Sequence, residues 1–160
     1  MYLVLHLLRQ YGILVVFAGV LAEQLGFPLP SWPLLIAAGA MAAVSVLDLA
    51  VLIVVAAAAA ISADLIWYEA SLKVGYKPVE RIYRLMPSPE ACKRRTEDIF
   101  AQLGPWALPV AKFVPFASTF VVALSGVTRM TMTRFLIFDA SGAILYVAIP
   151  ITLGAISGTR

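Results

Sequence analysis

Four ionisable side chains stand in stretches that are otherwise apolar, and they are the residues best suited to chemistry. They are Glu23, Asp64, Lys112 and Asp139. A charge near the centre of a bilayer costs roughly 2.5–3.5 kcal/mol or more, so such groups pair, exchange protons or face water. Lys112 is able to neutralise a carboxylate, or to hold an anionic headgroup as a compact point charge. Because desolvation disfavours a charged carboxylate, Glu23 or Asp64 is expected to exchange protons near neutral pH, as a proton-coupled carrier requires.

Each of these residues also has a purely structural interpretation. Glu23 would then serve only as the partner of Lys112. Asp64 comes late in its apolar stretch and also fits the membrane interface. Lys112 is long enough to extend its ammonium to the surface. Asp139 is close to an expected helix start and fits an interfacial residue as well as a site residue.

The composition indicates an integral membrane protein with a single domain over residues 1–160. Hydrophobic residues make up 62% of the chain and charged residues 13%, and the mean hydropathy is +0.93. Soluble domains are roughly 45–50% apolar and about 25% charged. No catalytic motif or set of metal ligands stands out, so we expect neither an enzyme nor a bound metal or cofactor. The single cysteine, Cys92, has no disulfide partner within the chain.

The first organising element is a broken apolar hairpin over residues 10–47. Two apolar runs, each too short to cross a bilayer, flank a connection broken by Gly26, Pro28 and Pro30. This pattern predicts a re-entrant hairpin, with Glu23 beside the break. Residues 49–72 follow as a predicted transmembrane helix.

Residues 76–103 form the polar part of the chain. Ten charged residues lie between Lys77 and Asp98. Ser88 as N-cap and Pro89 in the first turn predict the start of a helix with one apolar face. The excess of lysine and arginine places this segment in the cytoplasm; the alternative is a surface that holds anionic lipid headgroups. Because interleaved aromatic residues are lacking, nucleic acid is not an expected partner.

A second broken hairpin is predicted over residues 104–130, with Lys112 before a break at Pro115. Pro115 is 11 residues before Gly126, and Pro28 is likewise 11 residues before Gly39. Paired interruptions of this kind are typical of inverted repeats in transporters. Residues 135–157 form the second predicted transmembrane helix, interrupted by Asp139 and Pro150. The expected fold is therefore an all-α integral membrane protein with two re-entrant hairpins in inverted repeat, transmembrane helices and a cytoplasmic amphipathic helix.

These motifs resemble the DedA family, also called the VTT or SNARE-associated Golgi protein family. The pattern Glu-x-x-Gly-x-Pro-x-Pro begins at Glu23, Asp64 and Tyr68 match the first long helix, and Lys112-Phe113-Val114-Pro115-Phe116 resembles Arg-Phe-x-Pro-Gly. The phrases EQLGFPLPSWPLL, SPEACKRRTEDIF and AKFVPF are similar to members fused to a rhodanese-like domain.

The resemblance implies a lipid flippase or scramblase, located in the plasma membrane (the bacterial inner membrane), for anionic lipids such as polyprenyl phosphates. Glu23 and Asp64 would be its proton-coupling carboxylates, and Lys112 with Ser118 would bind the anionic headgroup. Trp32 stands where many members carry a second acid, and Ser118 where they carry an arginine, so this centre carries less charge.

Two other functions and several partners remain open. One alternative is a transporter of small anions such as sulfur oxyanions, and the other is a membrane scaffold that transports nothing. Membrane lipids are the expected partners. A homodimer and a rhodanese-like partner are further candidates.

Overall fold

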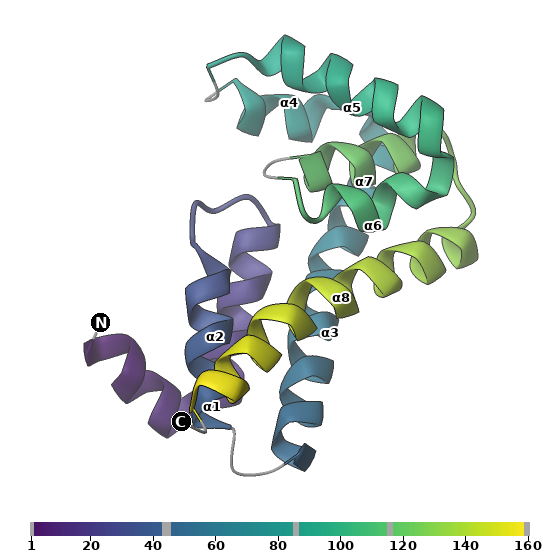
Figure 1. Ribbon diagram of the computed structural model, residues 1–160. Helices are drawn as coiled ribbons and strands as arrows, with labels where there is room; N and C mark the ends of the chain where they lie inside the picture. The colour runs from purple at the N-terminus through teal and green to yellow at the C-terminus, as the bar shows by residue number, and fades with distance from the viewer. Residues whose placement is uncertain (1, 43–45, 85–86, 115–116, 159–160) are drawn as a thin grey trace. The chain divides into compact units, whose positions relative to one another are not determined.

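The computed structural model describes residues 2–42, 46–84, 87–114 and 117–158, and within these ranges the regular structure is entirely helical. Figure 1 shows the helices in chain order. Their bounds are α1 Tyr2–Gln24, α2 Ser31–Met41, α3 Val46–Val74, α4 Lys77–Tyr83, α5 Pro89–Leu103, the 3₁₀ turn η1 Gly104–Trp106, α6 Ala107–Ala111, α7 Ala117–Val127 and α8 Met132–Gly158. The all-helical expectation is therefore confirmed for the described residues.

Among the described residues, two helices are long and apolar enough to cross a membrane. They cover Asp48–Val74 and Met132–Gly158, and only 39% of the most apolar window of each is buried within the protein. Large apolar side chains on both are exposed, among them Val54 at 66% and Ile137 at 64%. A core helix of a soluble protein would bury such side chains, whereas the lipid of a membrane covers them. These helices are longer than the expected spans 49–72 and 135–157.

Two further apolar helices are shorter, and one expected interruption is absent. Ser31–Met41 and Ala117–Val127 fall below the length of a span, whereas α1, which includes the apolar stretch Tyr11–Gln24, has 23 residues. Pro150 lies inside α8, which nonetheless runs without a break from Met132 to Gly158. Proline removes one helical hydrogen bond, and transmembrane helices tolerate that loss when neighbouring groups satisfy the freed carbonyl.

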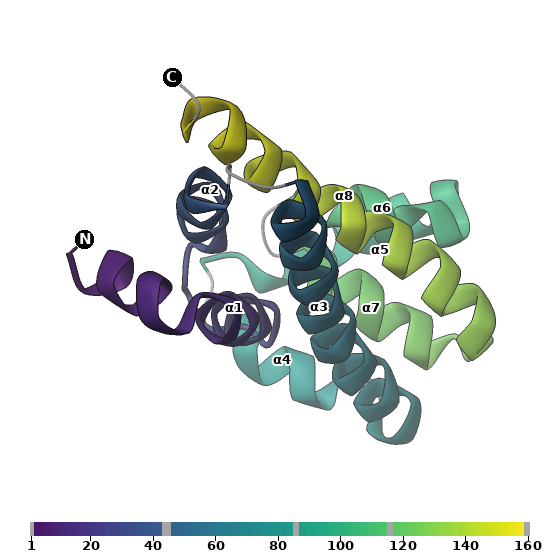
Figure 2. The same ribbon diagram turned by 90° about the horizontal axis from the view of Figure 1, so that it is seen from below.

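The chain divides into two compact units, each with its own core. The first unit comprises Met1–Ser62 and Ala143–Arg160. In it α2 packs beside α1 (Figure 2). A methyl group added at Gly39 would come within 2.1 Å of the Ile151 carbonyl oxygen on α8, and one at Gly154 within 2.0 Å of the Ile36 oxygen. Glycine is therefore required where the backbones of α2 and α8 meet.

The second unit, Ala63–Gly142, joins the polar segment to a second apolar core. Within it α5 and α6 pack against α7 (Figure 1). Ile99 and Phe100 of α5 pack against the core that includes Phe120 and Phe135. Helix α5 begins at Pro89 as predicted, but the Ser88 side chain makes no capping hydrogen bond. The charged segment is thus held by the apolar side of α5.

Candidate functional site

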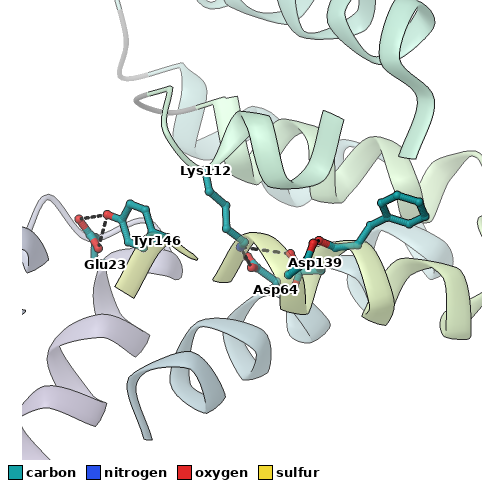
Figure 3. A network of polar contacts seen from close by, with 7 residues as sticks. Glu23, Asp64, Lys112, Asp139 and Tyr146 are labelled. Atoms are coloured by element: carbon teal, nitrogen blue, oxygen red, sulfur yellow. Dashed lines mark hydrogen bonds and ion pairs between the residues drawn. The ribbon is translucent and has the colours of Figure 1, made fainter. Parts of the chain in front are cut away.

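Lys112 lies between two buried aspartates in the second unit. Its ammonium donates to Oδ2 of Asp64 and lies 3.1 Å from Oδ1 of Asp139. The side chains of Lys112 and Asp139 are fully buried, and that of Asp64 is 1% exposed. Figure 3 shows the two carboxylates meeting the end of the lysine side chain. Three of the four sequence-predicted ionisable residues therefore form one ion network, with Asp139 as a full member.

Three helices and one glycine position this network. Asp64 comes from α3 and Asp139 from α8, while Lys112 directly follows the last residue of α6. A methyl group at Gly142 on α8 would lie 2.6 Å from Cα of Pro109 and 3.3 Å from Cδ of Lys112. Gly142 is one turn from Asp139, so its missing side chain lets α6 approach α8 closely enough for the ammonium to reach the carboxylate.

Glu23 belongs to a different polar network, which lies in the first unit. Its carboxylate accepts the backbone N–H of Ser31 at 3.3 Å, the Ser31 hydroxyl and the Tyr146 hydroxyl at 3.3 Å (Figure 3). The Trp32 ring lies 6.0 Å from the Tyr146 ring, centroid to centroid. Ser31 is the first residue of α2, and Pro30 before it provides no capping side chain. The Glu23 carboxylate thus takes the place of an N-cap.

The other sequence-predicted site residues lie near these networks or outside the description. Gly26, with φ of +106°, Pro28 and Pro30 lie in the connection between α1 and α2. Ser118 is half-buried in the first turn of α7. Pro115, the predicted second break, lies outside the described residues. No group of three or more acidic, cysteine or histidine side chains suited to a metal occurs among the residues searched.

Tyr146 and Ser31 are contacts of Glu23 that sequence reasoning missed. Tyr146 is one of six tyrosines, and nothing in its sequence neighbourhood sets it apart. Ser31 carried a weak signal, because it lies three residues after Pro28, as Ser118 lies three residues after Pro115. Both residues are buried, Tyr146 at 8% and Ser31 at 1% exposure. Their hydroxyls supply Glu23 with the donors that a partly desolvated carboxylate needs.

The polar segment has its own electrostatics. Lys93 on α5 lies 4.0 Å from Glu80 on α4 and 5.0 Å from the centre of the Tyr76 ring. Burial, with the Glu97 charge as a second cause, raises the pKa of Tyr76 to about 12. Burial also raises the pKa of the Cys92 thiol, against the opposing effects of Thr96 and Arg95. The thiol is therefore a poor nucleophile at neutral pH.

Comparison with known proteins places these features in context. The sequence profile of the VTT domain matches residues 29–156. An uncharacterized membrane protein of Synechocystis sp. is 28% identical over 153 residues, covering 96% of this chain and 70% of the relative. Uncharacterized membrane protein YbfM of Bacillus subtilis is 25% identical over 158 residues, covering 99% of this chain and 98% of the relative. Undecaprenyl phosphate transporter A of Staphylococcus aureus is 24% identical over 148 residues, covering 90% of this chain and 73% of the relative. No solved structure gives a significant match.

Proposed function

This chain belongs to the VTT-domain family, and we propose that it is a lipid flippase or scramblase that moves anionic lipids between the leaflets of its membrane. The observation that carries the proposal is the buried network of Lys112, Asp64 and Asp139, whose members stand in otherwise apolar stretches of the chain. Ionisable groups buried in a membrane protein usually mark a path for an ion or a polar substrate. A relative is named for transport of a phosphate-bearing lipid, which agrees with a cation at the centre of the site.

Lys112 is the proposed contact of the anionic headgroup, with Ser118 as a hydroxyl donor. Lys112 is occupied by two carboxylates in this structure, so a headgroup phosphate has to compete with them. Protonation of Asp64 removes one of the two competitors, so that the ammonium is able to bind a phosphate oxygen while it stays paired with Asp139. In the same way, protonation of Glu23 weakens its hold on Ser31, at the start of α2. Proton uptake and headgroup binding are then coupled.

The proposed topology has two re-entrant hairpins in inverted repeat. The first consists of α1 and α2, and the second of α6 and α7. Both α2 and α7 are 11 residues long, too short to cross a bilayer. Each has a glycine against the backbone of a long helix: a methyl group added at Gly39 would come within 2.1 Å of the Ile151 oxygen, and one at Gly126 within 2.6 Å of the Tyr68 oxygen. The connection after α1 exposes Phe27 at 62% and Leu29 at 49%, which suits a hairpin tip in lipid.

The charged segment 76–103 is proposed to face the cytoplasm, with the chain in the plasma membrane. Short loops rich in lysine and arginine stay on that side during insertion. A second copy of the chain and a rhodanese-like protein remain proposed partners, as the family resemblance implies.

Transport in proteoliposomes tests the function. Purified protein is reconstituted with a fluorescent anionic phospholipid, or with undecaprenyl phosphate, and the share of lipid accessible from outside is followed over time. Glu23→Gln should abolish movement. Lys112→Ala is combined with Asp64→Asn, because this pair keeps the network's net charge at its native value and so limits misfolding. Asp98→Asn, an exposed acid on α5, is the matched control and should behave as wild type.

Two results would count against the proposal. Native rates in both site variants would show that these residues are not needed for lipid movement. Uptake of radiolabelled thiosulfate or sulfite, with no lipid movement by the wild type, would favour a transporter of small anions instead.

A further inference from the structure

The ion network around Lys112 does not balance its charges. Two carboxylates, Asp64 and Asp139, face one ammonium, so the fully ionised network carries one excess negative charge. All three side chains are at most 1% exposed, so water does not screen that charge. An uncompensated charge is strongly destabilising in such surroundings. The network is therefore stabilised by any single positive charge that it can accept.

The same network leaves carboxylate oxygens without hydrogen-bond donors. Asp64 uses Oδ2 to bind the ammonium, and its buried Oδ1 has no hydrogen-bond partner among the described residues. Asp139 places Oδ1 against the ammonium at 3.1 Å, and its Oδ2 is likewise buried and without a hydrogen-bond partner in that part of the chain. Buried acceptors of this kind are normally satisfied. A proton on one carboxyl would turn an unsatisfied acceptor into a donor.

We propose that Asp64 and Asp139 together hold one exchangeable proton, with Asp139 as an integral part of the proton site. Uptake converts one carboxylate and one H⁺ into a carboxylic acid, and the remaining carboxylate stays paired with Lys112. The protonated network is neutral, and the deprotonated network carries one negative charge. The inference deepens the proposed function and rests on it only for the use to which the proton is put. Proton binding itself stands on the geometry of the network.

The surroundings favour a proton over a metal cation. The charged groups that face this site are Asp64 from α3, Lys112 from the end of α6 and Asp139 from α8. Helices α6 and α7, which pack in the same unit, carry no ionisable side chain. Two free carboxylate oxygens are too few for a hard cation, which takes about six oxygen ligands. The ammonium next to them would also repel a metal ion. A proton needs only one lone pair.

Mutual repulsion explains why one proton is held and why it can leave. Both carboxylates contact the same ammonium, so their charges lie close together, and two such carboxylates resist ionising at once. Lys112 holds the first negative charge firmly. The second negative charge has no cation of its own, so a proton has to neutralise it. The two aspartates therefore share one proton, and the loss of either should remove it.

Infrared spectroscopy of the protein in lipid nanodiscs tests the inference without measuring transport. The wild type at neutral pH should show the carbonyl stretch of a buried carboxylic acid, which disappears on titration to alkaline pH. Asp139→Asn and Asp64→Asn should each lose this band, because one carboxylate then balances Lys112. Lys112→Met should keep the band, since it removes the positive charge and leaves both carboxylates to be neutralised by protons. Asp98→Asn serves as the exposed control and should keep the wild-type band.

The outcomes separate this inference from the proposed function. A carboxylic-acid band that persists in both Asn variants would overturn the proton site. The absence of that band from the wild type would overturn it as well. If the wild type moves no lipid yet shows the predicted pattern of bands, the proposed function fails and the proton site stands. If lipid moves but the pattern is absent, the function stands and the proton site fails.

Discussion

Ser31 donates both its backbone N–H and its hydroxyl to the carboxylate of Glu23, so the end of α1 caps the start of α2. The seven residues between them include the break at Gly26, Pro28 and Pro30. Proline cannot donate, and Pro30 offers no side chain to the first turn. A carboxylate from the preceding helix supplies what the local sequence lacks. Glu23 therefore has a structural task in addition to any role in proton coupling.

Replacing Ser31 should weaken this junction. Ser31→Ala removes the hydroxyl donor but keeps the backbone N–H, so we expect a loss of about 1 kcal/mol in the free energy of unfolding. Thermal unfolding in detergent, followed by circular dichroism, measures the change. Ser62→Ala is the control, because Ser62 is exposed and its hydroxyl binds only the carbonyl of Ala58 within α3. Equal melting temperatures for the two variants would contradict the capping role.

A methyl group at Gly39 should be far more damaging than one at Gly12. At Gly39 it would lie 2.1 Å from a backbone oxygen of Ile151, whereas at Gly12 nothing lies within 4 Å. Gly39→Ala must therefore push α2 away from α8. Gly12→Ala should be neutral or stabilising by up to about 1 kcal/mol, because alanine favours helix. Comparing the melting temperatures of the purified variants is a direct check, and a well-folded Gly39→Ala with native stability would refute this packing.

Removing Lys112 alone should destabilise the protein more than neutralising Asp139. Lys112→Met leaves two buried carboxylates without a cation, and breaking a buried pair from one side costs about 3–5 kcal/mol. Asp139→Asn leaves Asp64 and Lys112 as a balanced pair, so its effect should be smaller. The melting temperatures and the yield of monodisperse protein in detergent report the order. The reverse order would mean that the Lys112 contacts are not the ones that hold the network together.

Tyr76 should ionise near pH 12 rather than near pH 10. Its folded pKa is raised to about 12, so the folded protein disfavours the phenolate. Tyr76 therefore contributes no penalty below about pH 10, and stability falls as the pH rises from there through 12. The absorbance titration of the wild type minus that of Tyr76→Phe isolates this group. A difference curve centred near pH 10 would show that Tyr76 is not buried against α5.

Cys92 should react slowly with maleimides at neutral pH. Burial raises the pKa of its thiol, so less reactive thiolate is present, and the rate should climb as the pH rises. Ala91 is exposed next to it on α5, so Ala91→Cys in a Cys92→Ser background provides the comparison and should react faster. Labelling of that variant in intact cells and in inverted vesicles also reports which side of the membrane carries the charged segment.

The sequence by itself determined that this is an all-helical membrane protein. The length and composition of an apolar run are local properties, and the bilayer requires apolar helices of sufficient length to cross it. It also singled out Glu23, Asp64, Lys112 and Asp139, since a charge in an apolar stretch is visible without a fold. The end of a helix can also be predicted from the sequence, because it depends on the residues next to it. Gly75, with φ of +71°, ends α3 at Val74, as its position in the sequence predicts.

Only the tertiary structure decided which of those charges meet. Lys112 is paired with Asp64 across 48 residues, and Glu23 with Tyr146 across 123. Such pairings depend on how helices distant in sequence pack, which is governed by close contacts such as Gly142 against Pro109 and Gly39 against Ile151. No local pattern encodes those contacts. For that reason Asp139 looked like an interfacial residue in the sequence and lies fully buried against Lys112 in the fold.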